Sequence, residues 1–235
     1  MNNIVLSIAI PTFNRAEWLR LCLSRLIPQL EGFYGEIEVT VYDNASPDNT
    51  GEVAIEFLTK NVPLTYIRNS ENIGSDKNIA QCFNKAIGQY VLILGDDDVV
   101  LNGSLQKIIK ALKDARYNHG AIFMRAYGYD DNYVTEMPYQ LFHKSKIYSN
   151  SNEFMSRCSS SMAFISSLVI NKSIIPNIDA NDYIGTALVQ TYVFYEAVRS
   201  AKTNFFINEY LIAAKRVEQR DYDVTKVFGS ALNNA

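Results

Sequence analysis

Three consecutive aspartates, Asp96, Asp97 and Asp98, directly follow an apolar run, "YVLILG", that has the composition of a buried strand. Adjacent carboxylates raise one another's pKa unless a positive charge lies between them. One interpretation is a solvated acidic turn. The other is a binding site for a divalent cation, because hard cations such as Mg²⁺ and Mn²⁺ prefer oxygen ligands. The three aspartates alone leave both interpretations open.

Two other polar segments follow apolar runs in the same way. "PTFNR" starts at Pro11, after "VLSIAI", and "DNAS" starts at Asp43, after "IEVTVY". Open parallel α/β sheets bind ligands beyond the carboxyl ends of their strands, and all three polar segments fall at such ends. This arrangement predicts that they form one site rather than three unrelated loops.

The elements that would position these segments alternate along the chain. Strands are expected over residues 5–10, 37–42, 64–69, 90–95 and 121–127, and helices over 14–30, 52–61, 79–88 and 104–115. This alternation predicts an α/β fold with an open, mainly parallel sheet flanked by helices. Farther along, we expect a strand within 162–174, a helix over 183–201 and a strand over 204–216. The polar stretch 129–152 has no clear period and is predicted to be a mobile or ligand-facing segment.

Local signals predict where two of the helices begin and end. Asn14, with Glu17 three residues later, is typical of a capping box, and Pro28 predicts that the first helix kinks or ends there. Gly88 occupies the position expected for the C-terminal cap of the helix over 79–88.

The composition is that of an ordinary globular protein, with 48% hydrophobic residues and a net charge of -3 over 235 residues. No Lys/Arg run stands out, so nucleic acid is not expected as a partner. No stretch approaches the roughly 20 apolar residues of a membrane span, and "MNNIVLSIAI" is interpreted as a strand rather than a signal peptide. The scattered Cys22, Cys82 and Cys158 predict reduced core residues of a cytosolic protein, and the absence of CxxC argues against a zinc site.

Four segments, taken in order, carry a resemblance to a known family. They are "SIAIPTFNRAEWL", "VTVYDNASPDNT", "YIRNSENIGSDKNIAQCFNKAIGQYVLILGDDD" and "VVLNGSLQKII". Together they resemble the family 2 glycosyltransferases of the GT-A fold over roughly residues 4–112. The motifs are short individually, whereas the ordered set at this spacing is specific. The variant motifs "DNAS", "ENIG" and "GDDD" are similar to those of bacterial enzymes that build O-antigen or capsular polysaccharide, including abequosyltransferase-like members.

The resemblance implies one catalytic domain over residues 1–235, with a donor half over 1–115 and an acceptor half over 116–235. Its donor would be a nucleotide-diphosphate sugar, and its acceptor a glycan or lipid-linked glycan. It also implies a cytoplasmic protein with peripheral contact to the inner membrane. The donor-binding residues implied by the matching motifs are Pro11, Thr12, Asn14, Arg15, Asp43, Asn44, Asp76, Lys77 and Asp96. Structural alternatives are a helix cap for Asn14, a turn aspartate for Asp43 and a solvated helix charge for Lys77.

The resemblance assigns the aspartates different roles. Asp96 would accept a hydrogen bond from the ribose, and Asp97, alone or with Asp98, would coordinate Mn²⁺ or Mg²⁺ on the diphosphate. Gly95 stands where the commoner D-x-D-D spelling has its first acidic residue, so the choice between Asp97 and Asp98 stays open, as does a metal held mainly by phosphates and water.

The implied chemistry is an inverting displacement at the anomeric carbon. A divalent cation stabilises the leaving diphosphate, and a carboxylate takes the proton of the acceptor hydroxyl. Asp182 is the residue predicted for this base, with Asp179 and Glu196 nearby, although Asp182 is also explained as an acid at a helix N-terminus.

Rival hypotheses come from other protein classes. A non-catalytic nucleotide-sugar-binding or scaffold protein of the same fold is the main alternative, because the usual E-D signature of the base is missing. A nucleotidyltransferase or an NAD-dependent enzyme would need a glycine-rich loop after the first strand, and "PTFNRAEW" has no glycine there.

Overall fold

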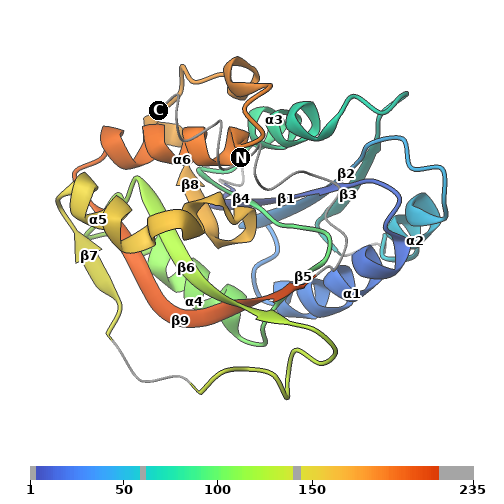
Figure 1. Ribbon diagram of the computed structural model, residues 1–235, viewed down its shortest axis with the longest axis horizontal. Helices are drawn as coiled ribbons and strands as arrows, with labels where there is room; N and C mark the ends of the chain where they lie inside the picture. Colours follow the sequence, from blue (N-terminus) through green and yellow to red (C-terminus); the bar gives the residue numbers. More distant parts are fainter. Residues whose placement is uncertain (1–3, 59–61, 140–143, 217–235) are drawn as a thin grey trace.

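The computed structural model describes residues 4–58, 62–139 and 144–216 (Figure 1). Its strands are β1 (Leu6–Thr12), β2 (Ile37–Asp43), β3 (Leu64–Arg68), β4 (Tyr90–Ile93), β5 (Asp98–Val100), β6 (Ala121–Tyr129), β7 (Lys146–Tyr148), β8 (Leu168–Asn171) and β9 (Asn204–Lys215). They form one sheet in the order β3-β2-β1-β4-β8-β6-β9-β5, with β7 also paired to β9. The predicted strands are therefore confirmed, and β5 and β7 are additional.

The sheet has two halves with different pairing. In the first half, β1 pairs in parallel with β2 and β4, and β2 pairs in parallel with β3, as predicted. In the second half, β8 is antiparallel to β4 and β6, β9 is parallel to β6, and β5 and β7 are antiparallel to β9. The pairing is therefore parallel in the first half of the sheet and mixed in the second half.

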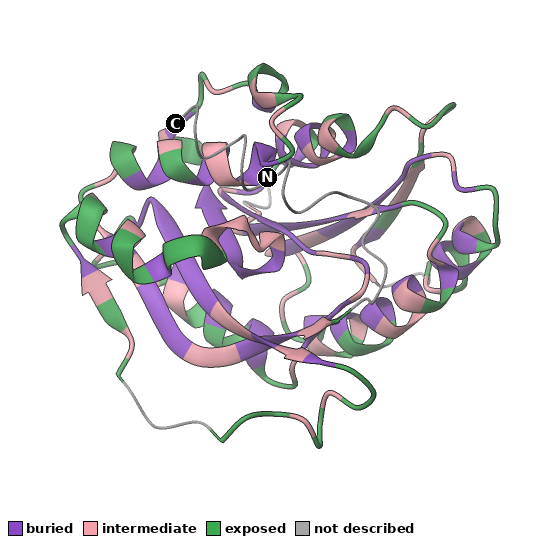
Figure 2. Ribbon diagram, viewed as in Figure 1, coloured by how far each residue is buried: buried purple, intermediate pink, exposed green. Residues whose placement is uncertain are grey.

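The α-helices are α1 (Ala16–Leu26), α2 (Thr50–Glu56), α3 (Ser75–Lys85), α4 (Ser104–Leu112), α5 (Ser151–Cys158) and α6 (Val189–Ser200). One core cluster joins α1, α2 and α4 to the sheet, and a second joins α3, α5 and α6 to it. Leu6, Ile8 and Ile10 of β1 belong to the first cluster and Ala9 to the second, which is the alternation expected of a strand covered on both faces. Figure 2 shows the buried residues concentrated along the strands and on the inner sides of the helices.

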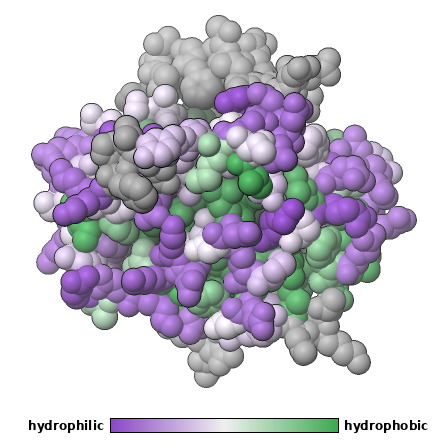
Figure 3. All heavy atoms as spheres, turned by 90° about the horizontal axis from the view of Figure 1, so that it is seen from below, coloured by the Kyte–Doolittle hydropathy of each residue, from purple (hydrophilic) through white to green (hydrophobic). Residues whose placement is uncertain are grey.

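One face of the molecule is mainly hydrophilic. Figure 3 shows hydrophilic side chains over much of the face seen from below, with smaller hydrophobic areas between them. The three cysteines are buried and free, as predicted. Within the described ranges, no helix has the length and apolar character that a membrane crossing requires.

The start of α1 corrects one prediction. Arg15, not Asn14, occupies the N-cap position, and no side chain of the helix itself caps it. Asn14 has a φ of 55° and its amide donates to Ser46 Oγ at 2.9 Å. The first helical amide, that of Ala16, instead donates to Asp48 Oδ2 at 3.3 Å, so the cap comes from the loop before α2. The prediction for Pro28 is confirmed, because α1 ends at Leu26 and a 3₁₀ turn follows.

Gly88 corrects a second prediction. The helix α3 ends at Lys85, and its terminal carbonyls accept hydrogen bonds from Lys172 Nζ rather than from a glycine cap. A Cβ at Gly88 would lie 2.7 Å from the backbone nitrogen of Ser7, and the Gly88 amide donates to Ser7 Oγ at 2.7 Å. Glycine is required here because the chain passes very close to β1.

The polar stretch 129–152 contains β7 and the beginning of α5. The Asn150 side chain accepts from the amides of Asn152 and Glu153, which caps α5.

The helix expected over 183–201 starts later, at Val189. Before it lie a 3₁₀ turn (Ala180–Tyr183) and two residues with positive φ, Gly185 and Ala187, which are incompatible with a continuous helix.

Candidate functional site

The loop after β1 and the turn after β4 meet at the carboxyl edge of the sheet, because the two strands are parallel neighbours. Arg15 Nη1 donates to Asp97 Oδ2 at 2.8 Å and to Asp96 Oδ1 at 3.3 Å. A guanidinium therefore lies between two of the three aspartates and offsets their mutual repulsion. The predicted meeting of these two polar segments is confirmed by this contact.

Asp96 has an unsatisfied side-chain atom. Its Oδ2 is buried and has no hydrogen-bond partner of ordinary geometry in the described part of the chain, and the same holds for Thr12 Oγ1. Burial, reinforced by the negative charge of Asp97, raises the pKa of Asp96 to about 7, and Arg15 opposes this rise. The Thr12 side chain also opposes the rise in the pKa of Asp96, so these two buried groups lie close to each other. Buried polar atoms are nearly always paired, and a ligand at this edge could complete their hydrogen bonding.

Asp98 lies in a different environment from Asp97. Its side chain is buried, its Oδ2 accepts a hydrogen bond from the Ser166 hydroxyl, and Ser166 Oγ accepts from the Gly95 amide at 2.8 Å. Burial raises the pKa of Asp98 well above its usual range. The Asp97 side chain, in contrast, is 20% exposed. Asp98 thus links the aspartate turn to the segment before β8, whereas Asp97 is open to solvent.

Asp43 is fully buried at the end of β2. Its Oδ1 accepts from the amide and hydroxyl of Ser46, at 2.8 and 2.5 Å, and its Oδ2 accepts from the Tyr66 hydroxyl at 2.6 Å. Arg68 Nε lies 3.8 Å from the same Oδ2. Both carboxylate oxygens therefore already have protein partners, and they fix the loop whose Ser46 also holds Asn14.

Asn44 holds the loop that leads to α3. Its Oδ1 accepts from the Ile73 amide at 3.0 Å, and its Nδ2 donates to Asn72 Oδ1 at 2.8 Å. Asp76, in the first turn of α3, accepts at Oδ2 from the amides of Gly185 and Ala187, at 2.7 and 3.1 Å. Asn44 thus holds the segment before α3, and Asp76 connects α3 to the segment before α6. Lys77 is exposed beside them.

Asp182 lies apart from these contacts. It is an exposed residue of the 3₁₀ turn Ala180–Tyr183. That turn is fastened to the far end of α3, where Asn84 Nδ2 donates to Asp179 Oδ1 at 2.6 Å and Asn84 Oδ1 accepts from the Ala180 amide at 3.0 Å. No described hydrogen bond or ion pair joins Asp182 to the three aspartates, so its role as base stays a prediction.

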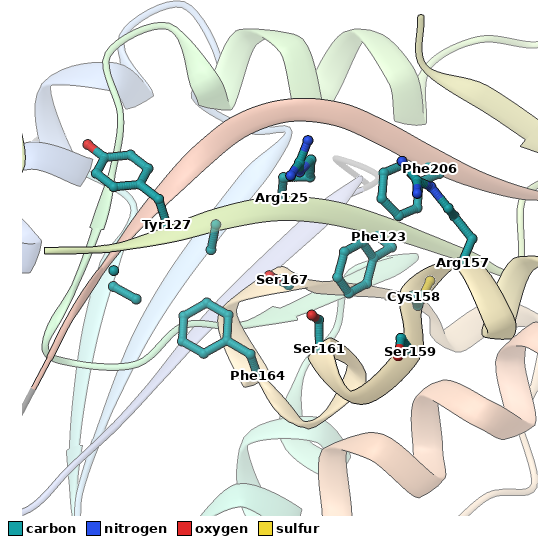
Figure 4. A pocket seen from close by; sticks show the side chains of 13 residues that line it. Phe123, Arg125, Tyr127, Arg157, Cys158, Ser159, Ser161, Phe164, Ser167 and Phe206 are labelled. Carbon is teal, nitrogen blue, oxygen red and sulfur yellow. The ribbon is translucent and has the colours of Figure 1, made fainter. Parts of the chain in front are cut away.

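A pocket of about 400 Å³ is lined by residues of β6, of β9 and of the segment from α5 to Ser167 (Figure 4). Its lining includes Arg125 and Tyr127 of β6, Phe164, Ser167 and Ala214. Ala214 is the partner of Asp98 in the β5–β9 register, and Ser167 follows the serine that bonds Asp98. Sequence analysis did not predict this pocket, because its residues are scattered and carry no motif.

A full metal cage is not formed by protein groups alone. In the described ranges, no group of three or more His, Cys, Asp and Glu side chains is placed to hold an ion. Of the three aspartates, Asp97 alone has a partly exposed side chain, whereas Asp96 and Asp98 are buried. Mg²⁺ commonly binds through one or two carboxylates together with substrate phosphates, and this donor set fits that pattern.

Residues 7–178, well over half of the chain, match the family description Glycosyl transferase family 2. The chain belongs to this family. Abequosyltransferase RfbV of Salmonella typhimurium is 30% identical over 202 residues, which cover 81% of this chain and 60% of RfbV. Glycosyltransferase GlyG of Streptococcus pneumoniae is 23% identical over 54% of this chain and 41% of its own length. The chain therefore spans less than two thirds of the length of these relatives.

Solved structures confirm the GT-A fold of this family 2 chain. S. aureus TarS 1-349 in complex with UDP-GlcNAc superposes with a TM-score of 0.76 at 16% identity, covering 98% of this chain and 65% of that one. The mannosyltransferase PcManGT from Pyrobaculum calidifontis, in complex with GDP-Man and Mn2+, gives a TM-score of 0.62 at 15% identity, covering 99% and 65%.

Proposed function

We propose that this chain is a metal-dependent glycosyltransferase. It transfers a sugar from a nucleotide-diphosphate donor to a hydroxyl of a glycan or lipid-linked glycan in bacterial surface polysaccharide synthesis, at the cytoplasmic face of the inner membrane. The observation that carries the proposal is the cluster of Arg15, Asp96 and Asp97 at the carboxyl edge, with two unsatisfied atoms beside it. The names of RfbV, TarS and PcManGT support the same class of donor.

The unsatisfied atoms set the orientation of the donor. Asp96 Oδ2 accepts a hydrogen bond from a ribose hydroxyl, and the Thr12 hydroxyl forms a hydrogen bond with the same ligand. Asp43 and Asn44 contribute by holding the two loops that enclose the nucleoside, since their own polar atoms are engaged within the protein. Pro11, Asn14, Asp76 and Lys77 complete the proposed donor-binding set.

Asp97 is the proposed metal ligand. We prefer Asp97 to Asp98 for this role because Asp98 is buried and bonded to Ser166, whereas the Asp97 side chain is partly exposed. A divalent cation bound at this position supplies Lewis-acid stabilisation of the leaving diphosphate. The guanidinium of Arg15 contributes a second positive charge on the same side.

In this proposal the acceptor lies across the donor sugar, toward the pocket lined by Ser167 and Ala214. Its hydroxyl is a poor nucleophile while neutral, so a carboxylate must take its proton as the new bond forms. Asp182 is the proposed base and the proposed outcome is inversion, by a single displacement from the face opposite the leaving diphosphate.

The decisive test is calorimetric titration of the protein with UDP, GDP, CDP and dTDP, each with and without Mn²⁺, followed by an assay of donor turnover. Micromolar binding of one nucleotide only with Mn²⁺, together with turnover, supports the proposal. Metal-dependent binding without turnover on any acceptor tested would favour the non-catalytic binding protein. No binding under either condition would overturn the donor site.

A further inference from the structure

Asp76 joins two parts of the chain that are far apart in the sequence. It lies in the first turn of α3, and its Oδ2 accepts hydrogen bonds from the amides of Gly185, at 2.7 Å, and Ala187, at 3.1 Å. These amides lie 109 and 111 positions later, in the segment before α6. Figure 1 shows this segment, in orange, beside the first turns of α3. The contact therefore fastens the second half of the chain to a helix of the first half.

The Asp76 carboxylate serves this segment rather than its own helix. An acidic side chain near the start of a helix commonly stabilises that helix by capping its free amides. In α3, however, the N-cap position is occupied by Gly74, and no side chain among the described residues caps the helix. The hydrogen bonds that Asp76 accepts in the described part of the chain go to Gly185 and Ala187. The carboxylate is thus turned away from α3 and toward the segment before α6.

The backbone of the segment has a shape that receives a carboxylate. Gly185 and Ala187 have φ of 93° and 58°, in the left-handed region that alanine rarely adopts without support from its surroundings. Their amides, two positions apart, converge on one oxygen, as in the concave backbone arrangements that bind anions. Between them, the Thr186 hydroxyl donates to the Tyr183 carbonyl at 2.7 Å. This turn therefore depends on the Asp76 carboxylate for its conformation.

The helix α3 holds the segment at two places. Near its last turn, Asn84 pairs with Asp179 and with the amide of Ala180, and at its first turn Asp76 holds the two amides described above. The eight helical positions from 76 to 84 correspond to about 12 Å at 1.5 Å per residue. Asp182, the proposed base, lies between the two points of attachment in the sequence. A rigid helix thus supports the turn that carries it.

We infer that Asp76 is a positioning residue of the proposed transfer reaction. Its carboxylate holds the segment of Asp182 against α3 and so sets the place of the base relative to the acceptor hydroxyl. This inference rests on the proposed function and gives Asp76 a role beyond the donor-binding set. A catalytic group displaced by about 1 Å lowers a rate by about 100-fold, so a contact outside the reacting atoms has a large effect on kcat.

The test compares two substitutions of Asp76. Asp76→Ala removes both hydrogen bonds, whereas Asp76→Asn keeps a carbonyl oxygen that accepts them and removes the charge. Glu52→Ala is the matched control, because Glu52 is an exposed acid in the first turn of another helix, α2. For each protein, kcat is measured as release of nucleoside diphosphate from UDP-, GDP-, CDP- and dTDP-glucose with water as acceptor. Nucleotide affinity with Mn²⁺ is measured by calorimetry, and backbone order parameters of Gly185 and Ala187 by ¹⁵N NMR relaxation.

In Asp76→Ala we expect kcat to fall by at least about 10-fold, with a smaller change in nucleotide affinity. The order parameters of Gly185 and Ala187 should fall from the value of rigid backbone, about 0.85, toward about 0.6. Asp76→Asn should recover most of the kcat and of the backbone order. Glu52→Ala should behave as the wild type in all three measurements.

Three outcomes would overturn the inference. Equal losses of kcat in Asp76→Ala and Asp76→Asn would show that the charge matters rather than the hydrogen bonds to the segment. A loss of nucleotide affinity as large as the loss of kcat would place the carboxylate on the nucleotide. Unchanged order parameters in Asp76→Ala would show that the segment is held without this residue. Absence of nucleotide binding and turnover in the wild type, with order parameters that respond as expected, would instead contradict the proposed function.

Discussion

Arg15 and Asp97 are 82 positions apart in the sequence, and Nη1 of the one lies 2.8 Å from Oδ2 of the other. The contact joins the loop after β1 to the turn after β4, and Asp96 shares the same guanidinium at 3.3 Å. The side chains of Arg15 and Asp97 are 35% and 20% exposed, so this pair is accessible to a ligand. It is therefore a feature of the site rather than of the core.

Arg15→Gln is expected to weaken nucleotide binding by at least about 10-fold, because a charge-assisted interaction with the diphosphate is lost and Asp96 and Asp97 repel each other. Calorimetric titration with Mn²⁺ measures this effect. Arg20→Gln is the matched control: it is the next arginine of the chain, and its guanidinium pairs with Glu56 at the surface. Equal losses in both variants would show that the effect is not specific to the site.

We expect Asp97→Ala to affect metal-dependent nucleotide binding and Asp98→Ala to affect the free energy of unfolding. Asp97→Ala should abolish the Mn²⁺ dependence of nucleotide binding and leave the free energy of unfolding nearly unchanged, because the side chain is partly exposed. Asp98→Ala should lower the free energy of unfolding by about 1–3 kcal/mol, because Ser166 loses a buried partner. Denaturant unfolding and titration of both variants separate the two outcomes. An unchanged Mn²⁺ response in Asp97→Ala would remove this residue from the metal site.

Ser166→Ala tests the link between the two halves of the sheet. The hydroxyl joins Asp98 and the Gly95 amide, so its removal would leave the buried Asp98 carboxyl and the partly buried Gly95 amide without this partner. We expect the free energy of unfolding to fall by about 1–3 kcal/mol and nucleotide affinity to fall as well, because the aspartate turn loses its support. Ser160→Ala, at an exposed position in the adjoining 3₁₀ turn, should change neither quantity.

Most of the donor half could be predicted from the sequence because its signals are local. Apolar runs of strand length followed by polar segments indicated the parallel strands, and the meeting of Arg15 with Asp96 follows from the adjacency of β1 and β4. The helix ends were less predictable. The cap of α1 comes from Asp48, more than 30 residues away in the chain, and Gly88 serves a close approach to β1 instead of a cap.

The acceptor half was less predictable because its contacts are long-range. The partner of Asp98 is Ser166, in a segment with no motif, and the pocket residues Arg125 and Arg157 come from β6 and α5. The start of α5 did carry a local signal, Asn150 followed by Glu153, which was hidden within a polar stretch. The position of Asp182 relative to α6 could not be predicted from helical spacing. Gly185 and Ala187 have positive φ, so the turn that contains Asp182 is not continuous with α6.

His119 gives a pH prediction that is independent of the site. It is buried, stacks between Tyr117 and Phe205, and its Nδ1 lies 3.0 Å from Thr203 Oγ1. Burial lowers the pKa of His119 below its ordinary value of 6.5. The unfolded state then binds more protons, so the stability from this group is present above pH 6.5 and is lost as pH falls through the lowered pKa.

The comparison of wild type with His119→Gln isolates this contribution. Asp96, whose pKa is raised to about 7, changes stability with pH in the opposite direction and is present in both proteins. We expect the difference in the free energy of unfolding between the two proteins to shrink as pH falls below 6.5, measured by urea unfolding between pH 5 and 8. A difference that is constant over this range would contradict the lowered pKa.

Asp182→Asn tests the proposed base by separating chemistry from binding. If Asp182 takes the proton of the acceptor hydroxyl, kcat should fall by about 10²–10⁴-fold while the affinity for the nucleotide with Mn²⁺ stays unchanged. Glu196→Gln, on α6, should keep the wild-type kcat. The reverse pattern would transfer the role to Glu196. Wild-type rates in both variants would mean that the proton leaves by another route. Proton NMR of the product would then show whether the reaction inverts or retains the anomeric configuration.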